Sequence, residues 1–231
     1  TFPYTYFWNN GATGSTAFGL ISGTYWCNIT DANGCQITSG NIFINQPSQL
    51  VVTASNTSVS CYGGNDGTAT VSVSGGTGIY TYAWSPTPQI TPSAIGLISG
   101  TYSCNITDAN GCTVNSGNIF VSQFSQIVIT PSTTLVSCNG GSDGTATVSV
   151  LGGSTPYTYL WNNGQTTATS IGLSFGNYNC TITDANGCQI TSGNILVNQP
   201  SQLVFTTANT SVSCYGGSNG TATVTASGGT L

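Results

Sequence analysis

This 231-residue chain contains nine cysteines and five aspartates, which are its candidates for covalent, metal-binding or acid–base chemistry. Cysteines form disulfides or bind metals, and aspartates act as bases or as Ca²⁺ ligands. The chain has no Lys, Arg, His or Glu, and a base near neutral pH is normally His or a tuned carboxylate or Lys. Only the aspartates remain for that role: Asp31, Asp66, Asp108, Asp143 and Asp184. Since no catalytic pair is recognisable, we predict that the chain is not an enzyme and has no catalytic residue.

The missing positive charge also limits the partners of the chain. Nucleic-acid binding needs Lys and Arg to displace counterions from phosphates, and an anionic membrane surface attracts the same residues. No apolar run approaches the roughly 20 residues of a spanning helix. We therefore predict no nucleic-acid partner and no membrane insertion in this segment. The chain lacks both Met and a signal peptide, so we expect it to be an excerpt of a longer mature chain.

Three sequence markers each recur three times along the chain and show that it is built from internal repeats. The hexapeptide Thr-Asp-Ala-Asn-Gly-Cys occurs at Thr30–Cys35, Thr107–Cys112 and Thr183–Cys188. Val-Ser-Cys followed by Gly-Gly recurs at Cys61, Cys138 and Cys214. An aromatic alternation recurs at Tyr4, Tyr6 and Trp8, at Tyr80, Tyr82 and Trp84, and at Tyr157, Tyr159 and Trp161. The three markers keep a constant phase, so the unit is a module of about 77 residues.

Module boundaries fall in the segments that start at Gln46, Gln123 and Gln199, which separate apolar, strand-like runs. We predict the C-terminal part of a module at 1–47, complete modules at 48–124 and 125–200, and the N-terminal part of a further module at 201–231. Either the array continues beyond both ends, or neighbouring chains complete each other's half-modules by exchanging strands. We favour the continuing array.

The local pattern of each module predicts β-strands. Ala69, Val71 and Val73 alternate with hydroxyl side chains, and Tyr102, Cys104 and Ile106 alternate in the same way before a turn signal at 108–111. Asp-Ala-Asn-Gly suits a turn that closes a hairpin. Helical periodicity is absent. The fold class is therefore predicted to be all-β, with tandem immunoglobulin-like β-sandwich modules.

Several motifs together resemble the SprB-type repeat of large bacterial surface adhesins and extracellular filaments. They are the run Cys138–Val148, the motif Tyr157–Trp161 and the repeated Thr-Asp-Ala-Asn-Gly-Cys. The resemblance spans essentially the whole chain and implies a surface adhesin or filament with an immunoglobulin-like fold. It names no active site. One departure is a third cysteine in each module, at Cys27, Cys104 and Cys180, where such repeats usually have two.

The cysteines are expected to form disulfides and not a metal site, because the chain has no His and no Cys-x-x-Cys pair. The resemblance implies the pairs Cys61–Cys112 and Cys138–Cys188 within modules. It leaves Cys35 and Cys214 to partners outside this sequence.

The third cysteine of each module is either a buried thiol or an inter-chain link. Its place in the strand alternation directs the side chain toward the expected core, which favours the buried thiol. A link across the last hairpin, such as Cys104 to Cys112, is a further alternative. Counting back from the turn places Cys104 opposite residue 115, so the register disfavours that link unless a bulge intervenes.

Six asparagines lie in Asn-x-Ser/Thr glycosylation sequons: Asn28, Asn56, Asn105, Asn179, Asn209 and Asn219. Chance accounts for part of this set in a chain so rich in Asn and Thr. Asn28 and Asn105 nevertheless share one outward position, and Asn56 and Asn209 share another. We expect glycosylation of some Asn, Ser or Thr side chains.

The aspartates and aromatic residues each have two interpretations. The aspartates all lie in predicted turns, which makes turn chemistry the first interpretation and Ca²⁺ binding between modules the alternative, since one Asp per turn is few ligands for Ca²⁺. We therefore expect no cofactor. Tyr80, Tyr82 and Trp84 share one strand face, which favours core packing over a sugar-binding strip.

The leading functional hypothesis is a structural extracellular fibre or adhesin stalk on a bacterial cell surface, stabilised by disulfides and glycosylated. Its partners would be further copies of the same repeat or chain in a filament. The alternative is a carbohydrate- or surface-binding module repeated along the chain. An enzyme would require a catalytic pair that these residues do not supply.

Overall fold

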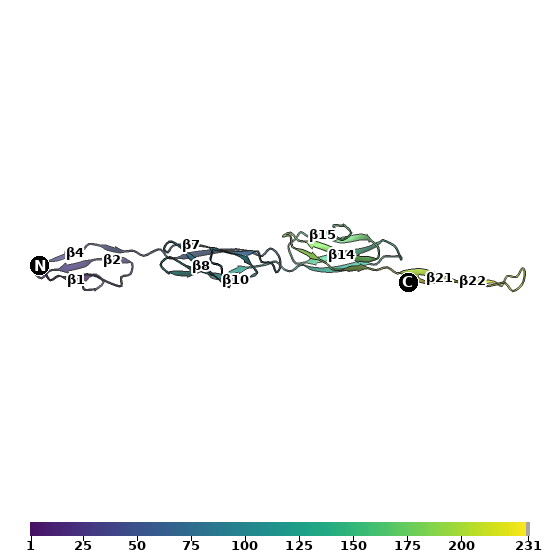
Figure 1. Cartoon of the computed structure of the whole chain (residues 1–231), viewed down its shortest axis with the longest axis horizontal. Helices are drawn as coiled ribbons and strands as arrows, with labels where there is room; N and C mark the ends of the chain where they lie inside the picture. Colours follow the sequence, from purple (N-terminus) through teal and green to yellow (C-terminus); the bar gives the residue numbers. More distant parts are fainter. Residues whose placement is uncertain (230–231) are drawn as a thin grey trace. The chain divides into compact units, whose positions relative to one another are not determined.

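The computed structural model describes residues 1–229, and this part of the chain consists of strands, turns and loops (Figure 1). The expectation of an all-β fold is thus confirmed. Among the described residues, no helix is long and apolar enough to span a membrane.

The chain divides into two compact units. The first contains Thr1–Ser55, Thr70–Pro92 and Ser103–Asn118, and the second contains Asn56–Ala69, Ser93–Tyr102 and the described residues from Ile119 onward. The module boundaries after residues 47, 124 and 200 remain a prediction. Residues 230 and 231, the last two of the predicted fourth segment, lie outside the described residues.

The second unit contains one complete sandwich. Its strands are β13 (Val128–Thr134), β14 (Gly144–Leu151), β15 (Thr158–Trp161), β16 (Thr169–Leu173), β17 (Gly176–Tyr178), β18 (Cys180–Thr183), β19 (Gln189–Thr191) and β20 (Ile195–Val197). Two three-stranded sheets have the orders β13-β14-β16 and β15-β18-β19, while β17 pairs with β20. Neighbouring strands run antiparallel.

Side chains from both sheets meet in one core. Strand β14 alternates, so that Ala146 and Val148 are buried between residues that are more exposed. They share a cluster of buried side chains with Trp161 and Ile182 of the other sheet. Since apolar faces of two sheets pack on each other, the predicted immunoglobulin-like sandwich is confirmed. The indole of Trp161 donates a hydrogen bond of 2.8 Å to the Thr167 carbonyl, which satisfies its one polar group.

The first unit repeats parts of this plan. Its strands include β1 (Thr5–Trp8), β2 (Gly23–Tyr25), β3 (Cys27–Thr30), β4 (Gln36–Thr38), β5 (Ile42–Ile44), β8 (Thr81–Ser85) and β11 (Thr113–Asn115). They form a sheet of order β1-β3-β4 and the pair β2-β5, while β8 and β11 both pair with β10 (Gly100–Thr107). In the second unit, β12 (Ile119–Val121) pairs with the Gly100–Tyr102 part of β10. The remaining strands β6 (Val51–Thr57), β7 (Gly67–Ser74) and β9 (Ser93–Leu97) form a three-stranded sheet.

The local sequence predictions hold in this structure. Ala69 and Val71 are buried on one face of β7, and Cys104 and Ile106 are fully buried on β10. The predicted turn after β10 closes the β10-β11 hairpin, in which Thr107 pairs with Thr113. Trp84 is 5 % exposed, as expected for core packing and not for a sugar-binding strip.

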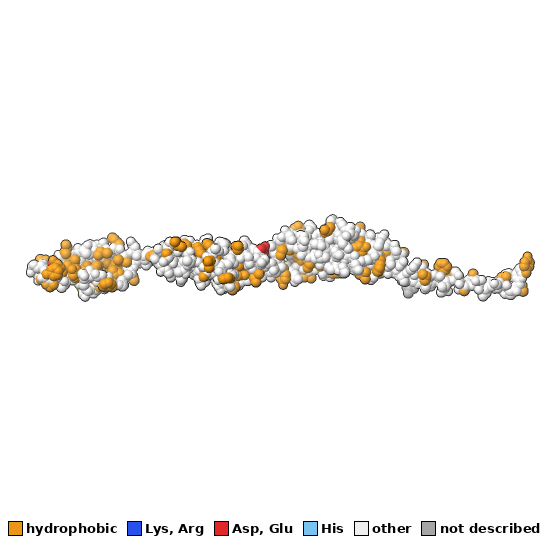
Figure 2. Space-filling model, viewed as in Figure 1, with side chains coloured by type: hydrophobic (Ala, Val, Ile, Leu, Met, Phe, Trp, Pro, Cys, Tyr) orange, Lys and Arg blue, Asp and Glu red, His pale blue; other side chains and the backbone are white. Residues whose placement is uncertain are grey.

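Residues 201–229 form a two-stranded sheet of β21 (Ser201–Thr210) and β22 (Thr221–Gly229). Nearly all of its side chains are exposed, and hydrophobic ones lie on its surface (Figure 2). Val224, for example, is 68 % exposed, although Val148, its counterpart in β14, is 2 % exposed.

Candidate functional site: a disulfide between successive repeats

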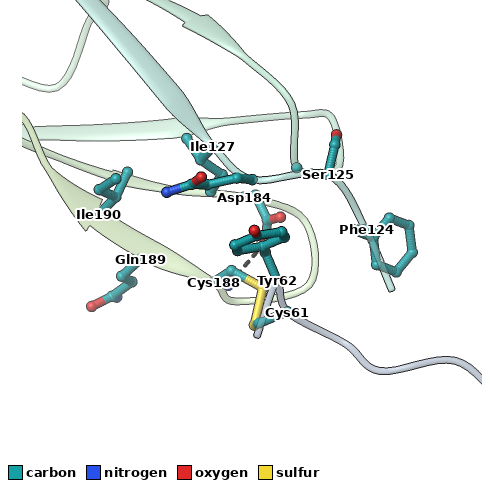
Figure 3. Close-up of a pocket in the computed structure, with 11 residues that line it drawn as sticks. Cys61, Tyr62, Phe124, Ser125, Ile127, Asp184, Cys188, Gln189 and Ile190 are labelled. Carbon is teal, nitrogen blue, oxygen red and sulfur yellow. Dashed lines mark hydrogen bonds between the residues drawn. A yellow bond between two sulfur atoms is a disulfide. The ribbon is translucent and has the colours of Figure 1, made fainter. Parts of the chain in front are cut away.

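Cys61 and Cys188 form a disulfide, with their Cα atoms 5.7 Å apart and a sequence separation of 127 (Figure 3). Both cysteines belong to the second compact unit. Cys61 comes from the Val-Ser-Cys loop of one repeat, and Cys188 comes from the Asp-Ala-Asn-Gly-Cys hairpin of the next. The bond therefore joins successive repeats covalently.

The hairpin between β18 and β19 fixes Cys188. One carboxylate oxygen of Asp184 accepts the N–H groups of Asn186 and Cys188, each at 2.9 Å. The other oxygen accepts the N–H of Ser154 at 3.0 Å, which ties the hairpin to the turn after β14. Gly187 has a φ of 84°, a conformation that glycine adopts without steric cost. The hydrogen bonds of this turn thus fix the position of Cys188.

These hydrogen bonds also control the ionisation of Asp184, which is 5 % exposed. Burial by itself would raise its pKa. Backbone N–H donors, led by that of Ser154, outweigh this effect and hold the pKa of Asp184 below the ordinary value of 3.8. The carboxylate is therefore ionised at neutral pH and is already surrounded by donors.

The loop around Cys61 is fixed by the end of its own repeat. The N–H of Val59 donates to the Ser122 carbonyl and the N–H of Gly63 donates to Gln123 Oε1, both at 2.8 Å. Asp66 accepts the N–H of Ser60 at 2.9 Å. These hydrogen bonds position Cys61 independently of its disulfide with Cys188.

Further contacts surround the disulfide. Asn186 Nδ2 donates to the Ser60 carbonyl at 3.2 Å and to Ser154 Oγ at 3.0 Å. Cys188 Sγ lies 3.4 Å from the Ser60 carbonyl oxygen, a van der Waals contact because a disulfide sulfur carries no proton. A cleft of about 290 Å³ lies beside the bond, with Tyr62 and Phe124 among its lining residues (Figure 3).

This pairing corrects the pairs Cys61–Cys112 and Cys138–Cys188, since Cys112 and Cys138 are free thiols. In the complete sandwich Cys138 precedes β14, and the hairpin of Cys188 is bonded to Ser154, after β14. The eight residues of β14 span about 26 Å, whereas a disulfide requires Cα atoms within about 7 Å. Strand β7 has the same length, so the reason extends to Cys61 and Cys112.

Sequence reasoning missed the pair across the repeat boundary. No signal in the spacing distinguishes a cysteine of one module from its copy in the next, because the modules are near-identical. The pairing depends on which end of a sandwich each cysteine occupies. The sequence alone does not reveal these positions.

The remaining cysteines fall into two groups. Cys35, Cys112, Cys138 and Cys214 are exposed thiols. Cys27, Cys104 and Cys180 are buried thiols, as the inward phase of these positions indicates. The register pairs Asn105 with Asn115, one position away from the expected alignment of Cys104 with residue 115.

The predicted glycosylation residues lie on strands and loops and are not gathered in one place. Asn28, Asn56, Asn105, Asn209 and Asn219 are exposed, and Asn179 is half-buried. Asn56 Nδ2 donates to the Phe120 carbonyl at 2.9 Å, and Asn219 Nδ2 donates to Ser213 Oγ at 2.9 Å. Glycosylation of these six residues remains a prediction.

Comparison with known proteins finds a family of repeats that this chain resembles. The family model described as SprB repeat matches residues 53–88, 130–166 and 206–231. Three segments of the chain are thus similar to the SprB repeat. Each match includes a Val-Ser-Cys loop, and so Cys61, Cys138 or Cys214. No curated protein matches the chain.

The chain is also similar to solved structures. A structure of the four N-terminal Ig domains of Dscam1 isoform 9.44 has 11 % identity and a TM-score of 0.30, with 84 % of this chain and 64 % of that chain covered. The extracellular domains 3–5 of Drosophila OTK give 15 % identity and a TM-score of 0.27, with coverage of 80 % and 73 %. The chain thus spans less than two thirds of the Dscam1 structure.

Proposed function

We propose that this chain is a segment of an extracellular fibre or adhesin stalk on a bacterial cell surface. The observation that carries the proposal is the Cys61–Cys188 disulfide between successive repeats. If tension is applied outside the two cysteines, force passes through the S–S bond and the residues between them carry none. Disulfides persist in extracellular compartments, and repeats of one module give a stalk whose length grows with copy number.

The chemistry of the chain supports a mechanical role over catalysis or metal binding. The chain has no His, Lys, Arg or Glu. Asp108 and Asp184 use their carboxylate oxygens to accept backbone N–H groups within their own hairpins and adjacent turns. These oxygens already have donors, so we expect calorimetric titration with Ca²⁺ to give no heat. Saturable heat would overturn the expectation of a cofactor-free stalk.

Intact cells test the location. Antibodies against residues 125–200 should label unpermeabilised bacteria that express the protein, and external proteinase K should remove the signal. A cytoplasmic protein of the same cells serves as the control for leakage. Labelling that appears only after permeabilisation would contradict a surface stalk.

A sugar coat would supply the solubility that a charged surface normally gives. Five of the six sequon asparagines are exposed, including Asn28 and Asn105 at equivalent positions. Intact mass of protein from the native source should fall after enzymatic or chemical deglycosylation. An unchanged mass equal to that of the bare chain would remove the coat from the proposal.

The cleft beside the disulfide favours a second candidate function, carbohydrate binding. Tyr62 and Phe124 are 55 % and 40 % exposed there, and exposed rings stack on sugars. Asn139 and Pro200 occupy the equivalent positions one repeat later, so the pair is not repeated. A glycan array with wild type and Tyr62→Ala tests this function, and binding that Tyr62→Ala abolishes would support it over a purely structural role.

A further inference from the structure

Cys180 is a buried free thiol of the complete sandwich and lies eight positions before Cys188 in the chain. We propose that tension on the stalk uncovers this thiol, which then attacks the Cys61–Cys188 disulfide at Cys188, forms a Cys180–Cys188 bond and frees Cys61. The junction thereby lengthens under sustained load. This inference rests on the proposed stalk function, which supplies the tension.

The folded hairpin keeps Cys180 away from the disulfide. The N–H of Asp184 donates to the Cys188 carbonyl at 3.0 Å, so these two residues face each other across the turn. Cys180, at the start of β18, lies four positions before Asp184, which at about 3.4 Å per residue places it about 14 Å along the strand. A disulfide requires Cα atoms within about 7 Å. Cys180 and Cys188 therefore cannot bond while this hairpin is intact.

The side chain of Cys180 is also closed off from solvent. It is 0 % exposed and belongs to the same core cluster as Ile195 and Val197 of β20. Its backbone N–H donates to Ser192 Oγ, and its carbonyl accepts the N–H of Ser192, both at 3.0 Å. Burial raises the pKa of the thiol, so it stays protonated in the folded chain. The strand that covers the thiol and the serine that holds its backbone both follow Cys188 in the chain.

This order along the chain connects the cover of Cys180 to tension. A load applied outside the bonded cysteines enters the chain after Cys188 and crosses to Cys61 through the S–S bond. Residues 189–200, which include β19 and β20, are therefore stretched, while residues 62–187 carry no load. Because β19 pairs with β18 and β20 pairs with β17, stretching removes both strands from the sandwich and exposes Cys180.

Loop-closure entropy decides which bond the unfolded segment keeps. The native bond closes a loop with a sequence separation of 127, whereas a Cys180–Cys188 bond closes one with a separation of eight. The cost of closure grows as (3/2)RT times the logarithm of loop length, so the short loop is favoured by about 60-fold. A Cys61–Cys180 bond, with a separation of 119, is disfavoured by nearly the same factor. The folded sandwich and the unfolded segment thus prefer different disulfides.

The exchange needs no external oxidant or reductant. The exposed Cys180 thiol gives its proton to water, and the thiolate attacks Cys188 Sγ. One S–S bond forms as the other breaks, and Cys61 leaves as a thiolate that takes up a proton from water. Because the intact β18-β19 hairpin excludes the new bond, the segment cannot refold as before and the junction stays open.

Unfolded protein tests the chemical step. The parent protein has its four exposed thiols removed by Cys35→Ser, Cys112→Ser, Cys138→Ser and Cys214→Ser. It is incubated without oxygen at about pH 8, near the ordinary thiol pKa of about 8.5, and then alkylated and digested with pepsin. Mass spectrometry should find a Cys180–Cys188 link and alkylated Cys61 after incubation in denaturant, and Cys61–Cys188 after incubation in buffer. Persistence of Cys61–Cys188 in denaturant, or a Cys61–Cys180 link, would overturn the proposal.

A force clamp tests the release in the folded chain. Tension is applied through handles fused to both ends of the same parent, without reductant. We expect a delayed extension of about 42 nm, because Cys61 and Cys180 have a sequence separation of 119 and an extended residue spans about 3.5 Å. Lowering the pH from about 8 to about 6 should slow this step by about tenfold or more, because less of the thiol is ionised. A rapid pull ends before the exchange and reports the intact bond.

Two buried cysteines provide a matched pair of variants. Cys180→Ala should lose the delayed extension, whereas Cys104→Ala should keep it, because Cys104 is equally buried but lies in the segment that carries no load. Peptide mapping first establishes that Cys61–Cys188 has formed in both variants. A delayed extension that persists in Cys180→Ala would refute the exchange and leave the stalk function standing. Immediate full extension of the parent and of both variants would instead refute the stalk function, because force would not pass through Cys61–Cys188.

Discussion

Cys180 lies directly opposite Trp161 on the paired strands β18 and β15, and the two side chains are 0 % and 1 % exposed. Cys104 and Trp84 have the same relationship, as do Cys27 and Trp8. A free cysteine in such a place acts as a small hydrophobic side chain that fills the space beside the indole. The third cysteine of each repeat is thus a core residue.

The first prediction concerns thiol reactivity. Burial raises the pKa of the Cys180 thiol, and the thiolate is the reactive form, so alkylation in the native state should be slow for two reasons. On monomeric protein, iodoacetamide followed by pepsin and mass spectrometry should label Cys112 and Cys138 and leave Cys104 and Cys180 unlabelled until denaturant is added. Rapid labelling of Cys180 in native protein would contradict its burial.

The sequence predicts the structural features that depend on neighbouring residues, and it does not predict those that depend on residues far apart in the chain. The alternation of Ala146 and Val148 and the turn before Cys188 are local, and both could be predicted from residue types. The disulfide could not, because it depends on which end of a sandwich carries each cysteine. Near-identical repeats make Cys112 and Cys188 equal candidates for Cys61, and only the tertiary structure separates them.

The second prediction concerns acid stability. The pKa of Asp184 is lower in the folded chain than its ordinary value of 3.8, so its contribution is fully present above pH 3.8 and is lost as the pH falls below that value. Asp184→Asn should lower the free energy of unfolding at pH 7 and flatten its decline between about pH 4 and pH 2. Chemical denaturation at several pH values measures both effects.

Asp143→Asn provides the matched control for that experiment. Asn219, at the equivalent position of the next repeat, accepts the same backbone bond at 3.0 Å that Asp143 accepts at 2.9 Å. We therefore expect Asp143→Asn to change stability at pH 7 by less than about 0.5 kcal/mol, the usual range for tolerated surface substitutions. An equal loss in both variants would show that the hairpin hydrogen bonds of Asp184 are not special.

The third prediction concerns the stability that the disulfide contributes. Closing a loop of 127 residues removes entropy from the unfolded chain, which the chain-entropy model equates with up to about 5 kcal/mol. Cys61→Ser combined with Cys188→Ser should lower the denaturant midpoint of residues 125–200, followed by hydrogen exchange of peptides from this segment, because fluorescence would sum over all four tryptophans. Cys112→Ser should leave it unchanged, because Cys112 is a free thiol. A midpoint that moves with Cys112→Ser would point to the other pairing.

The fourth prediction compares two glycines that both have positive φ. A Cβ at Gly152 would overlap the backbone carbonyl of Gln126, while a Cβ at Gly164 would have open space around it. Gly164→Ala should cost about 1–2 kcal/mol, the usual penalty of the left-handed region. Gly152→Ala should cost more than that, because it must also displace the end of the β13-β14 hairpin. Equal losses in thermal unfolding would argue against this close approach.

The last prediction is mechanical. With Cys61–Cys188 intact, pulling on attachment points outside both cysteines in an atomic force microscope should leave the intervening residues folded or slack. Reduction should add about 45 nm of contour length, since 127 positions separate the cysteines and an extended residue spans about 3.5 Å. The double variant Cys61→Ser/Cys188→Ser should show the longer contour without reductant, and Cys112→Ser should behave like wild type. If wild type extends equally with and without reductant, force does not pass through this bond, and the proposed mechanical role of the junction fails.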